Sequence, residues 1–70
     1  LLAKAEGWAK ESVKLNDTYS NNETLTGILI LSGKKEEART VANHAIELGE
    51  KNKINVQKVK IYLEKIEEMK

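Results

Sequence analysis

The sequence predicts an all-α fold of four antiparallel helices, and three observations support this prediction. Apolar residues recur at spacings of three and four along most of the chain, as they do in amphipathic helices. The 70 residues include no proline and only four glycines, so strong helix breakers are scarce. Residues that favour caps and turns divide the chain into four segments of helical pattern.

The first predicted helix covers residues 2–16. We expect Trp8 to pack in the core, because it lies on the apolar stripe, rather than to act as an exposed binding anchor. The helix should end at Asn16-Asp17-Thr18, since these three residues favour caps and turns. The stripe consists of Leu1, Ala5, Trp8, Ala9, Ser12, Val13 and Leu15.

The second predicted helix covers residues 21–32. Ser20 and Glu23 fit a capping box, in which the Ser20 hydroxyl accepts a backbone N–H and Glu23 reaches back to the cap. Gly33 can supply the left-handed residue that ends the helix. A strand is the alternative, because residues 24–26 alternate Thr-Leu-Thr and a run of Ile and Leu follows. The two end signals favour the helix.

The third predicted helix covers residues 35–48, with Gly49 as its terminator. The fourth covers residues 55–70, with Asn55 as its N-cap. The apolar stripe of the third helix is Ala38, Val41, Ala42, Ala45, Ile46 and Leu48, and that of the fourth is Val56, Val59, Tyr62, Leu63, Ile66 and Met69.

The first and third segments repeat each other at an offset of about 33 residues. Ala5 aligns with Ala38 and Ala9 with Ala42, so small residues recur where neighbouring helices can approach closely. A period near 34 residues with helix–turn–helix content is typical of tetratricopeptide arrays.

Residues 19–52 resemble one complete tetratricopeptide repeat. Leu25 and Ala38 stand at the family's Leu and central Ala positions, Gly33 lies at the turn between the helices, and Ala45 is the late small residue. The chain departs from the family at Asn22, Thr26, Leu29, Ala42 and Glu50, where Trp, Gly, an aromatic residue, a second aromatic residue and Pro are common.

The resemblance implies a right-handed array of helical hairpins. Residues 1–17 would be the second helix of a preceding unit, and residues 55–70 a C-terminal capping helix. The chain begins without Met, so we expect it to be a piece from the C-terminal end of a longer protein. The arrangement is also similar to the C-terminal helical extensions of some bacterial thioredoxin-family proteins. This second resemblance rests on the residue pattern Gly-Lys-Lys-Glu-Glu-Ala at positions 33–38, and it transfers no redox residue.

Composition excludes several classes of function. The absence of Cys excludes disulfides, thiolate metal sites and cysteine nucleophiles. A formal net charge of +1 argues against a nucleic-acid or anionic-membrane surface. The longest apolar run, residues 28–31, is far shorter than the roughly 20 residues of a membrane span. We therefore predict no cofactor, no metal site, no nucleic-acid partner and no membrane partner.

No group of side chains points to catalysis. We expect His44 to face solvent on its helix, near Glu47 only. The adjacent carboxylates at positions 36–37 and 67–68 point about 100° apart on a helix, so neither pair can act on one substrate. The lysines at positions 51, 53, 58, 60 and 65 are interleaved with glutamates, which indicates a solvated surface. The sequence therefore predicts a protein that is not an enzyme.

The remaining candidate is a peptide-binding groove. Tetratricopeptide arrays line their concave face with the first helix of each unit, so the resemblance implies that Glu23, Thr24, Gly27, Ile30 and Leu31 face a bound peptide. Ile30 and Leu31 add apolar surface to a helix whose core face is already occupied, which indicates either burial by neighbouring helices or a binding site. Thr24 and Gly27 do not match the family's clamp for C-terminal carboxylates, so we do not predict binding of chaperone tails.

The sequence thus predicts a protein–protein interaction module that binds a peptide or helix in a concave groove. The alternative is a structural helical cap on an adjoining, thioredoxin-like domain with no ligand of its own. The partner would be another protein, a peptide or the rest of the parent chain, and the exposed end helices also allow a homodimer.

Overall fold

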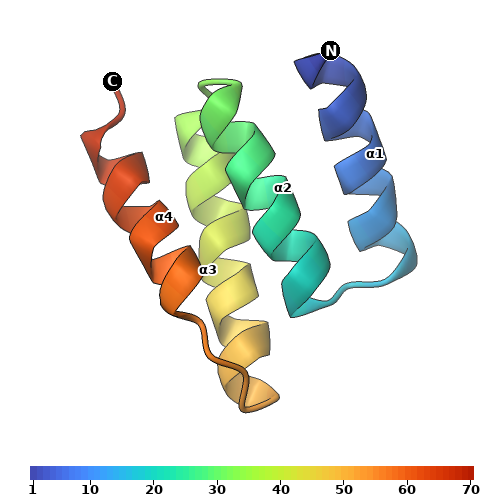
Figure 1. The fold of residues 1–70 in the computed structure, drawn as a ribbon, viewed down its shortest axis with the longest axis vertical. Coiled ribbons are helices and arrows are strands. Elements are labelled where there is room, and N and C mark those ends of the chain that lie inside the picture. Colours follow the sequence, from blue (N-terminus) through green and yellow to red (C-terminus); the bar gives the residue numbers. More distant parts are fainter.

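The computed structural model describes all 70 residues, which form four α-helices and no strand. The helices are α1 (Leu2–Leu15), α2 (Tyr19–Leu31), α3 (Lys35–Lys51) and α4 (Gln57–Glu68). The all-α prediction is confirmed, and residues 21–31 are helix rather than strand. The chain reverses direction from each helix to the next (Figure 1).

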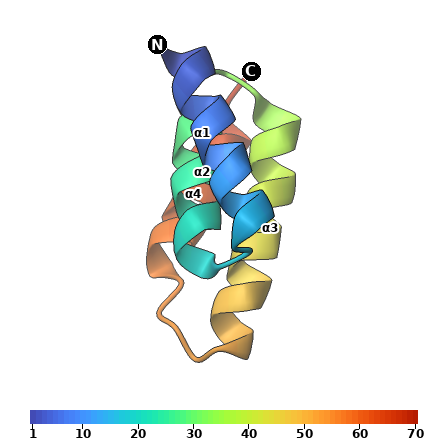
Figure 2. The same ribbon diagram turned by 90° about the vertical axis from the view of Figure 1, so that its right-hand side faces the viewer.

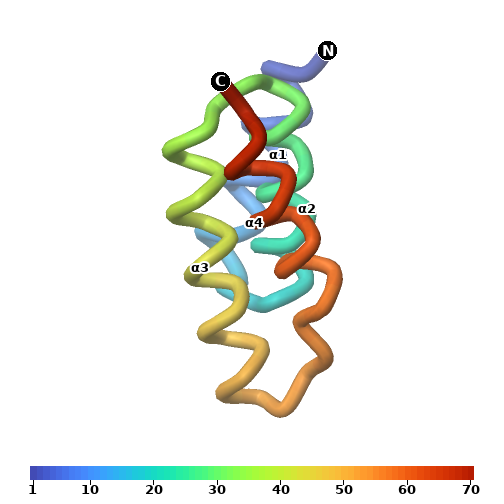
Figure 3. The backbone as a smooth tube through the Cα atoms, turned by 90° about the vertical axis from the view of Figure 1, so that its left-hand side faces the viewer, coloured from blue at the N-terminus to red at the C-terminus, as the bar shows by residue number.

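The helices form two layers. Seen from its two sides, the molecule has α2 and α4 in one layer and α3 in the other (Figures 2 and 3). The α2 backbone packs against all three other helices, whereas the α1 backbone packs against α2 alone. The hydrophobic core therefore lies where α2, α3 and α4 meet.

Small residues on α3 allow this close packing. Ala38, Ala42 and Ala45 are fully buried, as are Leu29 of α2 and Val59 of α4. Because alanine adds only a methyl group to the helix surface, larger side chains from both neighbouring helices can pack directly on α3.

The predicted capping box at the start of α2 is wrong. The helix begins at Tyr19 instead, and the Thr18 hydroxyl accepts the backbone N–H of Asn21 at 3.1 Å. Thr is also a good N-cap residue. The earlier start places Tyr19, which is only 7% exposed, inside the core. Burial of the Tyr19 ring therefore favours a helix that begins at this residue.

The predicted stop at Gly33 is confirmed. Gly33 has a φ of +73°, and its backbone N–H donates to the carbonyl of Ile30 at 3.0 Å. The next N–H, of Lys34, donates to the carbonyl of Leu29 at 3.0 Å. These two bonds form a Schellman motif, which satisfies the last carbonyls of α2.

Gly49 does not terminate α3, which continues to Lys51. The left-handed position after α3 is taken by Lys53, with a φ of 58°. Gly49 is buried inside the helix because Tyr19 and Val56 pack directly on it. Asn55 is not the N-cap of α4, because Val56 holds that position, but the Asn55 side-chain oxygen still accepts the N–H of the first helical residue, Gln57, at 2.9 Å.

The predicted burial of Trp8 is also wrong, because its side chain is 68% exposed. The α1 backbone lies close to α2 alone, and α1 reaches α3 through the Lys10–Glu37 ion pair, so a narrow strip of α1 is covered, with Glu6 and Ala9 as its buried residues. Trp8 precedes Ala9 by one residue, which turns it about 100° away from that strip.

Candidate functional site

A single groove, with a pocket of about 410 Å³, lies between α2 and α4. All five residues that the sequence analysis assigned to peptide binding line it, and the structure therefore brings them together. The α2 side consists of Glu23, Thr24, Gly27, Ile28, Ile30 and Leu31, and the α4 side of Lys58, Tyr62 and Lys65.

Helical spacing explains why these residues share one surface. Residues three and four apart lie on the same face of a helix. Glu23, Gly27 and Ile30 follow that spacing on α2, and Lys58, Tyr62 and Lys65 of α4 follow the same spacing. The groove is thus bounded by two helical faces rather than by loops.

Tyr62 lines the groove from α4 and lies against Gly27 of α2. A Cβ atom at position 27 would lie 3.1 Å from the Tyr62 hydroxyl oxygen, so Gly27 provides the space in which the phenol ring lies against α2. The ring is half-buried. It therefore offers an aromatic surface to a ligand while α2 restricts its movement.

The two ends of the groove differ in charge. At the end nearer the start of both helices, Lys58 Nζ lies 3.4 Å from Glu23 Oε1 and 5.9 Å from the centre of the Tyr62 ring. The Glu23 carboxylate raises the pKa of Lys58, and Tyr62 adds to this effect. At the other end, Lys65 forms no ion pair within the molecule.

Apolar surface lies beside the unpaired Lys65. Leu31 is 72% exposed and therefore belongs to the groove rather than to the core. Ile30 is half-buried, since it packs against the core and also lines the groove. This end combines exposed aliphatic groups with one uncompensated positive charge.

The α4 side of the groove was not predicted from the sequence. Tyr62 was assigned to the apolar stripe of its helix, and Lys58 and Lys65 were taken as solvated surface. The matching spacing of Lys58, Tyr62 and Lys65 is the signal that could have placed them on one face. Their proximity to α2 depends on how the helices pack, which local spacing does not specify.

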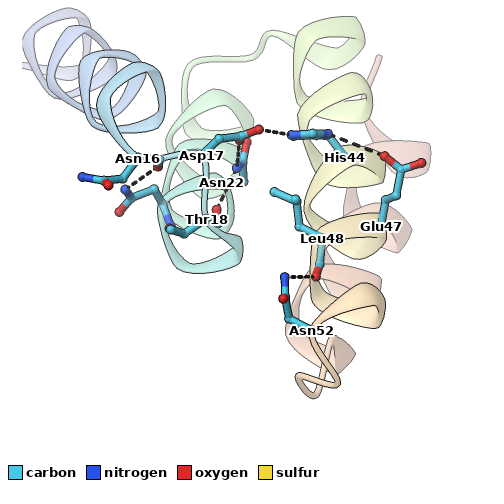
Figure 4. A network of polar contacts seen from close by, with 9 residues as sticks. Asn16, Asp17, Thr18, Asn22, His44, Glu47, Leu48 and Asn52 are labelled. Carbon is cyan, nitrogen blue, oxygen red and sulfur yellow. Dashed lines mark hydrogen bonds and ion pairs between the residues drawn. The ribbon is translucent and has the colours of Figure 1, made fainter.

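A second polar cluster joins the α1–α2 turn to α3 (Figure 4). His44 Nε2 lies 2.8 Å from Asp17 Oδ2, and Asn22 Nδ2 donates to Asp17 Oδ1 at 2.8 Å. These bonds, chiefly the one from Asn22, lower the pKa of Asp17. His44 is partly exposed, as expected, but its partner Asp17 was not predicted. The cluster ties the α1–α2 turn to α3, and the one pocket of the molecule lies elsewhere, between α2 and α4.

The adjacent carboxylates at positions 36–37 and 67–68 lie exposed on the surface, and Glu36 and Glu67 form ion pairs there. Arg39 pairs with Glu36 and, through its Nε at 3.1 Å, with Glu67. No group of three or more His, Cys, Asp or Glu side chains is arranged to hold a metal ion. None of the four helices combines the length and apolar character that crossing a membrane requires.

Comparison with protein-family models, curated proteins and solved structures finds no match for this chain. The tetratricopeptide resemblance therefore stays a prediction that rests on residue spacing, and the groove between α2 and α4 carries the functional argument.

Proposed function

We propose that this chain is a protein–protein interaction module that binds an apolar helix or peptide in the groove between α2 and α4. One observation carries the proposal. The residues assigned to binding from the sequence line the same pocket as Tyr62, and Leu31 stands 72% exposed among them.

Binding would be driven by burial of apolar surface. A docked helix would insert side chains beside Tyr62, Ile30 and Leu31, and each Å² of apolar surface removed from water contributes about 25 cal/mol. The groove is built on two helices, so little ordering entropy would oppose association. The Glu23–Lys58 pair at one end and Lys65 at the other would set the orientation of the ligand. The proposal includes no catalytic step, cofactor or metal.

The test uses helical peptides selected from a display library against the 70-residue chain. We expect Leu31→Asp to weaken a selected peptide by at least about tenfold, equivalent to about 1.4 kcal/mol, because it places a charge in the apolar part of the groove. Leu15→Asp is the matched control, since Leu15 is also 72% exposed but lies on α1, away from the groove. Leu15→Asp should change the affinity by less than about twofold.

Circular dichroism of both variants shows whether they remain folded. Loss of helicity in Leu31→Asp would assign Leu31 to the core and contradict the proposal. A library that yields no peptide sensitive to Leu31→Asp would contradict it as well.

A further inference from the structure

The outer face of α1 carries an uncovered stripe of side chains. Lys4, Trp8, Glu11 and Leu15, here called the α1 stripe, are spaced by four, three and four residues and so lie along one side of the helix. All four are exposed, Trp8 by 68% and Leu15 by 72%. Lys4 Nζ lies 5.7 Å from the centre of the Trp8 ring, and no other part of the molecule covers the stripe.

We propose that the groove between α2 and α4 accepts the α1 stripe of a second copy of this chain. This inference rests on the proposed function and deepens it by naming the helix that the groove binds.

The spacing of the two surfaces matches. Lys4, Trp8 and Glu11 are separated by four and three residues, as are Lys58, Tyr62 and Lys65 of α4. Both helices rise about 1.5 Å per residue. When the incoming α1 lies parallel to α4 with Trp8 beside Tyr62, Lys4 therefore reaches the level of the Glu23–Lys58 pair and Glu11 the level of Lys65.

The charges match in the same register. Neither Glu11 nor Lys65 has an ion-pair partner within its own molecule, so each can pair with the other across the contact. Lys4 would approach Glu23, which lies 3.4 Å from its one partner, Lys58. In the parallel orientation Lys4 meets the Glu23–Lys58 pair, whose opposite charges offset each other, whereas the reverse orientation would place Lys4 beside the unpaired Lys65, and like charges brought together oppose association. Charge thus selects the parallel orientation.

The apolar parts also correspond. The pocket of about 410 Å³ has room for side chains of one helix. The indole of Trp8 would pack against the ring of Tyr62, which itself lies against Gly27. The groove and the α1 stripe are different surfaces of the molecule, so the contact is heterologous. Each copy keeps one surface free after the first contact, and association continues beyond a dimer unless the ring closes.

Sedimentation of the chain over a range of concentrations tests the charge match. We expect the average mass of the unsubstituted chain to rise with concentration, and Glu11→Lys and Lys65→Glu each to weaken association by about tenfold. Combining both substitutions in one chain should restore association to within about threefold, because the pair is rebuilt with reversed signs.

Two variants control for net charge. Glu64→Lys and Lys60→Glu make the same changes in charge on the opposite face of α4, at exposed residues without ion pairs. They should leave association unchanged. If the controls weaken association as much as the stripe and groove variants do, net charge and not pairing is responsible, and the inference is overturned.

A mixing experiment tests the assignment of the two surfaces. Leu31→Asp damages the groove and leaves the α1 stripe intact, whereas Trp8→Ala does the reverse. Each variant alone should be monomeric, and an equimolar mixture should form a one-to-one complex, because one variant supplies the groove and the other supplies α1. Association that is lost in Trp8→Ala but retained in Leu31→Asp would assign the contact to two α1 helices and overturn the inference.

The two proposals can fail separately. If the chain stays monomeric up to about 1 mM while a selected peptide still depends on Leu31, the groove binds another partner and only the self-association is refuted. Leu15→Asp separates the two proposals from the other side, because Leu15 belongs to the α1 stripe and not to the groove. It should weaken self-association and leave the affinity for a selected peptide unchanged. Peptides insensitive to Leu31→Asp together with a monomeric chain would refute both.

Discussion

Two glycines inside helices have different surroundings. Gly49 lies inside α3, where a Cβ would overlap a methyl group of Val56 and lie 2.9 Å from Tyr19 Cδ1. Gly7 lies inside α1 with no atom near enough to touch a Cβ. A methyl group is thus excluded at Gly49 by close packing and is free to extend into solvent at Gly7.

We expect Gly49→Ala to lower the free energy of unfolding by about 1–3 kcal/mol, since the added methyl group overpacks the core. Gly7→Ala should raise it by about 0.5–1 kcal/mol, because alanine loses less backbone entropy in a helix. Urea denaturation followed by circular dichroism measures both. Stabilisation by Gly49→Ala would show that Tyr19 and Val56 do not pack on α3 as described.

The elements differ in how firmly they are held. The α1 backbone contacts only α2, and the helix buries only Glu6 and Ala9. In contrast, α3 packs against both α2 and α4 and has three alanines with no exposed surface. Less apolar burial per residue means that α1 can separate from the rest at a smaller cost in free energy.

Hydrogen exchange should therefore show α1 amides exchanging faster than those of α3 in a dilute solution of the monomer. Opening of α1 alone leaves the α2–α3–α4 core intact, whereas exchange in α3 requires that core to unfold. The measurement is hydrogen–deuterium exchange resolved by residue. Equal protection in both helices would mean that α1 and the core unfold together.

At the scale of the whole molecule, three carboxylates link separate segments. Glu6 of α1 accepts from Lys34 at 2.8 Å, Asp17 pairs with His44, and Glu67 of α4 pairs with Arg39. The pKa of each carboxylate is lowered, chiefly by Lys34 for Glu6, by Asn22 for Asp17 and by Arg39 for Glu67. These links therefore hold the helices together only while the carboxylates are ionised.

The sign of the resulting pH dependence follows from the lowered pKa values. A carboxylate whose pKa is lower in the folded state stabilises that state above its unfolded pKa, and this contribution disappears as the pH falls through the folded pKa. We expect the melting temperature to decrease as the pH is lowered from about 5 to about 3, and to decrease less in Asp17→Asn and Glu67→Gln. Thermal unfolding at several pH values measures this, and an unchanged slope in both variants would show that these carboxylates do not carry the effect.

The number, order and character of the helices could be predicted from the sequence alone. Helical periodicity, the glycine stop at position 33 and the bond that the Asn55 side chain accepts act over a few residues, so they can be recognised without a tertiary structure. The assignment of Gly27, Ile30 and Leu31 to a binding face came from the tetratricopeptide resemblance, and these residues do line the groove.

The tertiary structure alone decided which of these faces are covered and which residues meet. Trp8 and the buried alanines of α3 lie on similar stripes, but the α3 backbone packs against two helices and the α1 backbone against one. The meeting of Tyr62 with Gly27, and of His44 with Asp17, joins residues far apart in the chain. A local pattern fixes the direction of a side chain relative to its own helix, whereas its partners depend on how the helices pack, which is determined by the free energy of the whole molecule.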